Sequence, residues 1–207
     1  MALEDFTTYT EVDGQNKLTV ATNTITWTDL YDNAEDAHVY KDYGAGHFGD
    51  FEHLVSCDYT SHNAGAYVFG WVVANEIRNP YPDYTDSIYL RLYNRDPPTD
   101  MIHLVSREGG VVVGSDGHTL ASPGARLYHT IERAAAVATC KIYSDAARTN
   151  LLDTLSITCT EITFRYVYGF ANLESGDGRY YSGHVYDLDL QEVPPPPEHF
   201  MQPKKYW

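Results

Sequence analysis

Apolar and polar residues alternate along this chain, most clearly in its last third. Four runs between Ala125 and Gln191 show the pattern, at residues 126–133, 138–143, 164–170 and 183–191. Successive side chains of a strand point to opposite faces, so each run has the period of a strand with one buried and one polar face. Turn-forming residues separate the runs. The pattern predicts an antiparallel β-sandwich.

The same alternation continues through the rest of the chain, interrupted by Gly, Pro, Asn and Asp. We predict strands near residues 5–12, 17–21, 24–28, 37–43, 50–59, 66–74, 87–94, 101–107, 110–114, 125–133, 137–143, 153–158, 163–172 and 182–191. Only residues 29–35 and 145–151 are expected to form a helical turn. The fold class predicted is all-β, with well over a third of the residues in strands of two antiparallel sheets. We place these residues in the core: Val55, Phe69, Leu92, Ile131, Ile142, Val167 and Leu188.

Length and charge limit the number of domains and the classes of partner. With 207 residues, of which 43% are hydrophobic, the chain suits one β domain, which we place at residues 1–192. The formal net charge is −15, and no basic stripe is present to displace counterions from phosphates. We therefore expect no nucleic-acid partner and no insertion into a membrane.

The three cysteines, Cys57, Cys140 and Cys159, lack the spacing of a zinc or redox site. Cys140 and Cys159 flank a hairpin-like unit, so a disulfide between them is one interpretation. The other is that all three are buried thiols that pack as small apolar side chains.

Several sequence blocks, taken in order, resemble the concanavalin A-like (laminin G-like) lectin and glucanase domains, especially uncharacterised bacterial, phage and environmental members. The blocks are Asp5–Asp13, Val39–Gly44 with Phe48–His53, Thr139–Asp145 with Leu151–Leu155, and Ser182–Leu190. The resemblance covers about residues 5–191 and implies a jelly roll of two antiparallel sheets, one of them concave. Proteins with this fold include lectins, polysaccharide-cleaving enzymes and structural modules, so the fold alone does not assign a function.

Carboxylates decide whether a glucanase-like reaction is expected. Glucanases of this superfamily use a Glu-x-Asp-x-x-Glu strand motif, because alternate residues place a nucleophile and an acid/base on one face. Here Glu11 and Asp13 match the first two positions, but Asn16 stands where the last carboxylate is required. Asp50 and Glu52 also alternate on one strand, and we interpret them as an outward polar face. No catalytic residue is assigned, and the protein is expected not to be an enzyme.

Calcium is the cofactor that the resemblance implies, in a structural role near the ends of the first and last strands. The oxygen ligands available there are Asp5, Asp187 and Asp189. A carboxylate ladder facing solvent is the alternative interpretation. The nine histidines are scattered and do not predict zinc.

Aromatic residues are the candidates for glycan binding, because tyrosine and tryptophan rings stack on sugar rings while polar side chains bind hydroxyl groups. The candidate ligand-binding residues are Trp71, Tyr81, Tyr84, Tyr89, Arg91, Tyr93, Tyr180 and Tyr181. Tyr89, Arg91 and Tyr93 share one face of their predicted strand.

The alternating pattern stops at a four-proline segment, and residues 193–207 form a Pro-rich C-terminal tail. Its aromatic residues Phe200, Tyr206 and Trp207 are candidate docking residues for a neighbouring subunit. We therefore expect a homo-oligomer that associates through the tail.

The sequence favours a non-catalytic glycan-binding or adhesion module, or a surface-structural module, within a virion or extracellular assembly. The alternative is a polysaccharide-cleaving enzyme, a lyase or a glycoside hydrolase, on the same fold. The first residues lack the basic and apolar regions of an ordinary signal peptide. We expect the protein at a virion surface or outside a cell.

Overall fold

A computed structural model describes residues 3–31, 37–61, 67–77, 86–96, 99–120, 124–172 and 180–191. In chain order, the elements are η1 (Phe6–Thr8, a 3₁₀ turn), β1 (Thr10–Asp13), β2 (Leu18–Ala21), β3 (Thr24–Tyr31), β4 (Ala37–Asp42), β5 (Phe51–Ser61), β6 (Tyr67–Ala74), β7 (Ser87–Asp96), β8 (Thr99–Glu108), β9 (Val111–Thr119), β10 (Leu127–Ala134), β11 (Val137–Tyr143), β12 (Leu151–Thr158), β13 (Tyr166–Asn172) and β14 (Tyr180–Gln191). None of the described segments is a helix long and apolar enough to cross a membrane.

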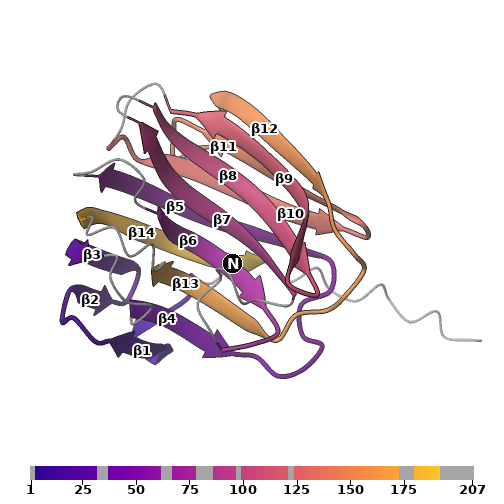
Figure 1. Cartoon of the computed structure of the whole chain (residues 1–207), viewed down its shortest axis with the longest axis horizontal. Coiled ribbons are helices and arrows are strands. Elements are labelled where there is room, and N and C mark those ends of the chain that lie inside the picture. The colour runs from indigo at the N-terminus through magenta and orange to yellow at the C-terminus, as the bar shows by residue number, and fades with distance from the viewer. Residues whose placement is uncertain are drawn as a thin grey trace, which may run out of the picture.

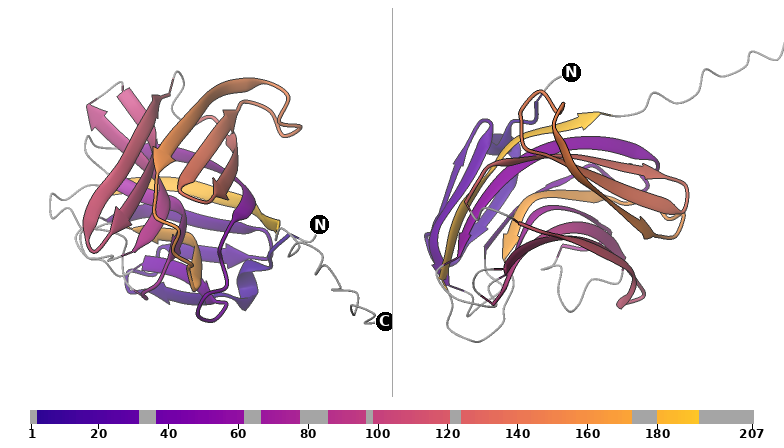
Figure 2. Two further views of the ribbon diagram at one scale, coloured as in Figure 1. Left: turned by 90° about the vertical axis from the view of Figure 1, so that its right-hand side faces the viewer. Right: turned by 90° about the horizontal axis from the view of Figure 1, so that it is seen from above.

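The strands form two antiparallel sheets of seven strands each (Figure 1). The sheet that we call the inner sheet has the order β1-β4-β13-β6-β7-β8-β9, and the outer sheet has the order β12-β11-β10-β5-β14-β3-β2. Figure 2 shows that both sheets curve in the same direction, with β6, β7 and β13 on the inside of the curve. The inner sheet therefore has one face packed on the outer sheet and one concave face turned away from it.

The prediction of an all-β sandwich is confirmed, because each predicted strand overlaps a strand of the structure, although residues 6–8 of the first one form a 3₁₀ turn. The largest difference is at residues 29–35, where a helical turn was predicted. Residues 29–31 instead continue β3, and residues 32–36 lie outside the described part. Asp29 has a positive φ of 48°, so β3 is locally irregular at this residue. The tail from residue 193 also lies outside the described part.

The core lies between the two sheets. Trp27 of β3 stacks on Phe170 of β13, with ring centroids 4.5 Å apart, and both side chains are fully buried. Gly183 makes this packing possible, because a Cβ atom there would lie 2.6 Å from the Trp27 ring and 2.5 Å from the carbonyl oxygen of Asp58. All seven predicted core residues are buried, but Phe69 belongs to a separate cluster on the concave face.

The three cysteines are free and buried. Val137 pairs with Thr158 across β11 and β12, so Cys140 lies opposite Leu155 and Cys159 lies beyond the end of the pairing. The strand register therefore keeps Cys140 and Cys159 apart, and the disulfide interpretation is wrong. Burial raises the pKa of the Cys140 thiol, as expected for a cysteine that packs as an apolar side chain.

Two histidines of the outer sheet are buried in the core in the neutral form. Nδ1 of His53 accepts a hydrogen bond of 3.1 Å from Nε1 of Trp71. Burial lowers the pKa of His53 to about 3, with a smaller contribution from His47. Burial also lowers the pKa of His129 to about 3, with a smaller contribution from Arg148. Each imidazole must become charged when the chain unfolds in acid.

These histidines make stability depend on pH. Both have folded pKa values near 3, below the ordinary value of 6.5, so the unfolded chain binds more protons between these limits. Their contribution is complete above pH 6.5 and is lost as the pH falls toward 3. We expect each to lower the free energy of unfolding by roughly 2 kcal/mol between pH 7.5 and pH 5. His129→Gln should flatten the pH dependence measured by urea unfolding, whereas His47→Gln on the surface should change it much less, because His47 makes only the smaller contribution to the pKa of His53. Parallel curves for the wild type and His129→Gln would contradict this.

Candidate functional site

The concave face carries a dense group of aromatic and basic side chains. Cross-strand partners share a face, and the register places Tyr168 opposite both Tyr40 and Val72, and Val72 opposite Tyr89. The residues that this alternation assigns to the concave face include His38, Tyr40, Tyr67, Phe69, Val72, Tyr89, Arg91, Tyr93, His103, Val105, Tyr166 and Tyr168. Alternate residues of the same strands fill the core between the sheets.

The centre of the concave face is a fully packed floor. Phe69 and Tyr89 meet edge to face with ring centroids 5.1 Å apart, and both are buried with Tyr168 in one hydrophobic cluster. The hydroxyl of Tyr168 donates a hydrogen bond of 2.8 Å to the carbonyl oxygen of Glu76. These contacts hold the floor in one arrangement and fix the side chains beside it.

Beside the floor lies a half-buried group that we call the Arg91 cluster: Tyr67 of β6, Arg91 and Tyr93 of β7, and His103 of β8. The rings of Tyr67 and Tyr93 stack almost in parallel, with centroids 4.2 Å apart and an interplanar angle of 8°. The guanidinium carbon of Arg91 lies 5.3 Å from the first centroid and 5.5 Å from the second. Such distances are typical of cation–π contacts.

His103 completes the Arg91 cluster. Its Nδ1 lies 3.3 Å from Nη2 of Arg91, within hydrogen-bonding distance. Gly117 of the neighbouring β9 leaves space for the imidazole, because a Cβ atom there would lie only 3.0 Å from Nε2 of His103. Strand pairing thus brings one cation, one imidazole and two phenol rings onto adjacent positions of three strands.

The structure places the predicted ligand-binding residues in different parts of the molecule rather than at one site. Arg91 and Tyr93 belong to the Arg91 cluster, and Tyr89 forms part of the buried floor. Trp71 and Tyr181 are fully buried in the core between the sheets, where a ligand would not contact them.

Tyr180 lies on the outer sheet, opposite Tyr31 and away from the concave face. Tyr81 and Tyr84 lie outside the described residues. Tyr67 and His103 are functional candidates that sequence reasoning missed. Their predicted strands were correct, but the pairing of β6 with β7 and of β7 with β8 could not be read from alternation.

The acidic candidates do not gather on the concave face. Glu11 lies opposite Val39, a core residue, and therefore shares the face that looks toward the outer sheet. Asp50 accepts a hydrogen bond from the backbone N–H of Ala135, and Glu52 lies on the outer sheet. These positions provide no pair of carboxylates across the concave face.

Among the described side chains of the inner sheet, Asp42 is the carboxylate that the register places on the concave face, at the end of β4. Arg165 holds it with two hydrogen bonds of 2.8 and 2.7 Å. This contact lowers the pKa of Asp42 to about 2, with help from the backbone N–H of Gly44. The carboxylate is ionised and paired, so it is unsuited to act as a general acid near neutral pH.

Asp187 and Asp189, the predicted calcium ligands, lie beside a hollow of about 180 Å³ on the exterior of the outer sheet. Arg126 donates a hydrogen bond of 2.5 Å to Oδ2 of Asp187, and Asn23 donates one of 3.1 Å to Oδ1. The carboxylate of Asp5 instead caps η1 through the N–H of Thr7.

No three acidic, histidine or cysteine side chains of the described part are grouped as metal ligands. Because Arg126 already neutralises Asp187, the residues present there do not fit a calcium ion.

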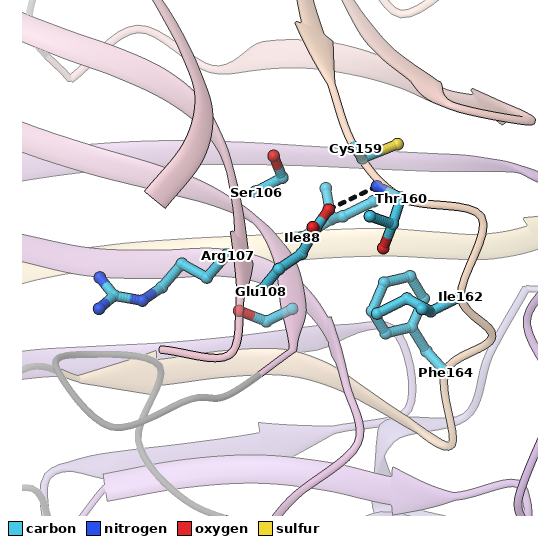
Figure 3. A pocket seen from close by; sticks show the side chains of 9 residues that line it. Ile88, Ser106, Arg107, Glu108, Cys159, Thr160, Ile162 and Phe164 are labelled. Atoms are coloured by element: carbon cyan, nitrogen blue, oxygen red, sulfur yellow. Dashed lines mark hydrogen bonds between the residues drawn. The ribbon is translucent and has the colours of Figure 1, made fainter. Parts of the chain in front are cut away.

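A crevice between the sheets near Cys159 is structural rather than a binding site (Figure 3). The backbone N–H of Thr160 donates a hydrogen bond of 2.5 Å to Oε1 of Glu108, which closes the crevice. Its interior has no room for a water-sized sphere. A larger hollow of about 320 Å³ lies beside His118, and its lining includes Leu120, Leu127 and Leu152. The crevice is thus too tight for a ligand, and the second hollow lacks the aromatic side chains of the concave face.

The architecture is shared by solved structures of distant sequence. The legume lectin-like domain from Entamoeba histolytica is 15% identical, with a TM-score of 0.59 over 89% of this chain and 90% of that one. The β-glucanase of Bacillus licheniformis is 10% identical, with a TM-score of 0.63 over 93% and 98%. This chain has the concanavalin A-like sandwich fold.

A third similar structure is the CBM2 module of the evolved Dit protein of Lactobacillus casei BL23 phage J-1, which is 10% identical, with a TM-score of 0.58 over 93% of this chain and 96% of that one. No family model and no curated protein matches the sequence. At these identities the similarity concerns the fold, so any function must be argued from the side chains of the concave face.

Proposed function

We propose that the protein is a non-catalytic glycan-binding module and that the concave face is its binding surface. The observation that carries this proposal is the Arg91 cluster, in which two half-buried tyrosine rings stand beside a guanidinium and an imidazole. Tyrosine rings offer apolar faces to the C–H groups of a sugar, and the two basic side chains offer hydrogen-bond donors to its oxygens. A comparable group lies on the outer sheet, where Arg126 contacts Tyr128 and Tyr186, but there Arg126 is paired with Asp187 and His184 with Asp58.

The packing beneath the Arg91 cluster supports the proposal. Side chains that are already held in one rotamer lose little conformational entropy when a ligand binds. Tyr67 and Tyr93 hold each other by stacking, and the neighbouring floor residues Phe69 and Tyr89 are buried. The binding groups are therefore ordered before a glycan arrives.

A polysaccharide-cleaving enzyme is the second candidate, and the concave face favours a lyase over a glycoside hydrolase. Hydrolysis usually requires two carboxylates facing the scissile bond, about 5–10 Å apart. Among the described residues of the inner-sheet strands, the register places only the carboxylate of Asp42 on the concave face, and Arg165 holds it. A lyase needs a cation to neutralise a sugar carboxylate and a group that moves a proton, and Arg91 with Tyr93 or His103 could supply both. Release of unsaturated products would identify a lyase, and their absence together with binding would identify a binding module.

We also propose where the module works and how it assembles: on a virion or an extracellular surface, as one subunit of a homo-oligomer joined by residues 193–207. The support is the apolar, Pro-rich composition of that tail and the phage module with a similar fold. The docking residues Phe200, Tyr206 and Trp207 lie outside the described part of the chain.

Glycan binding should depend on Tyr67 and Tyr93. An aromatic stacking contact is worth about 1 kcal/mol, so Tyr67→Ala and Tyr93→Ala should each weaken binding by roughly fivefold, as measured by calorimetry after a glycan-array screen. Tyr180→Ala is the matched control, because Tyr180 is an exposed tyrosine of the outer sheet. Circular dichroism should show that all three variants keep the fold. Equal affinities for Tyr93→Ala and the wild type would contradict the proposed site.

The tail should determine the oligomeric state. Removing residues 194–207 should leave a folded monomer, because the described sandwich ends at Gln191 and its described core is built from residues of the strands and of the segments between them. Sedimentation of full-length and truncated protein at micromolar concentration tests this directly. The same mass for both would refute association through the tail.

A further inference from the structure

The concave face differs from the rest of the chain in the sign of its charge. The chain contains 29 acidic and 14 basic residues. Yet the described concave face carries the cation of Arg91, while its one placed carboxylate, Asp42, is paired with Arg165. The described part of this aromatic surface thus presents a local positive charge.

Arg91 is the source of this charge. Its Nη2 faces Nδ1 of His103, while its Nε is buried and has no hydrogen-bond partner in the described structure. No carboxylate forms an ion pair with Arg91 in the described part of the chain. By contrast, Arg126 contacts Asp187 and Arg165 contacts Asp42.

A half-buried guanidinium with an unpartnered N–H is costly unless something binds it. The guanidinium group presents a planar fork of N–H donors that matches the two oxygens of a carboxylate, and such charge-assisted bonds are stronger than bonds to neutral hydroxyls. The Tyr67 and Tyr93 rings lie beside this fork, so a sugar stacked on a ring would bring its substituents close to Arg91. The surrounding acidic body does not prevent this at physiological salt, where charges more than about 8 Å apart are largely screened.

From this geometry we propose that the concave face recognises acidic glycans, with Arg91 binding the carboxylate of a uronic acid-type sugar while Tyr67 or Tyr93 stacks on its ring. The inference rests on the proposed glycan-binding function and adds the chemical class of the ligand. Neutral glucans and mannans lack the group that Arg91 would bind, so they should bind more weakly.

The test compares a short oligogalacturonate with its fully methyl-esterified form, which has the same sugars without the negative charges. Binding is measured by calorimetry in about 0.15 M salt, where long-range repulsion is screened. We expect the wild-type protein to prefer the acidic form by about tenfold or more, because only this form offers a carboxylate to Arg91. The affinity for the ester should change little with salt.

Variants of Arg91 test whether this residue causes the preference for the acidic form. Arg91→Gln should remove the preference for the acidic form, and Arg91→Lys should keep part of it, because lysine retains the charge but loses the fork. Lys141→Gln is the matched control, since it removes one positive charge from β11 of the outer sheet. Its preference should equal that of the wild type. Unchanged preference in Arg91→Gln would overturn the assignment to Arg91.

The outcomes separate this inference from the proposed function. Equal binding of the acid and the ester, with both lost in Tyr93→Ala, would overturn the acidic-glycan inference and leave glycan binding at the concave face intact. Preference for a sulfated galactan oligosaccharide over the galacturonate would also overturn it, in favour of a sulfate ligand. Absence of binding to acidic, esterified and neutral glycans alike would overturn both.

Discussion

The strands of the inner sheet must send alternate side chains into the space between the two sheets, and the rest of the structure depends on this requirement. Val39, Leu90 and Val167 fill that space because burying apolar side chains is the main source of stability. Because successive side chains of a strand point to opposite faces, their neighbours Tyr40, Arg91 and Tyr168 lie on the concave face. The composition of the candidate site is therefore a direct consequence of how the core packs.

An irregularity in β6 shows how strongly that packing controls the site. The pairing of β6 with β7 shifts between Phe69 and Trp71. The space at Gly70 faces Leu92 and Cys57 in the core, and Trp71 also faces the core. Two successive residues thus point inward, which returns Val72 to the concave face and explains why Phe69 and Trp71 lie on opposite faces. Without the shift, Trp71 would have lined the concave face.

Alternation predicted the strands well because the requirement for one apolar face is local and visible in the sequence. It could not predict the β6 irregularity, so Trp71 was a candidate ligand residue and Phe69 a candidate residue of the central core. It also could not show that β6, β7 and β8 are neighbours, so Tyr67 and His103 were not associated with Arg91. Strand order results from contacts between distant segments, and no single strand contains that information. The partnership of Arg126 with Asp187 was hidden for the same reason.

The concanavalin A-like fold explains the curved surface but not its chemistry. The similar structures include a lectin-like domain and a glucanase at 15% identity or less, so their activities do not transfer to this chain. The described side chains of this concave face combine stacked tyrosines with an arginine that has no carboxylate partner, and they include no carboxylate pair. This combination suits recognition of a negatively charged sugar better than hydrolysis of a neutral one.

A crystal structure of the protein with a bound oligogalacturonate would test the central claim most directly. The account predicts a sugar ring in contact with Tyr67 or Tyr93, and a carboxylate within hydrogen-bonding distance of the Arg91 guanidinium. A sugar bound to the outer sheet, or one on the concave face whose carboxylate points away from Arg91, would contradict it.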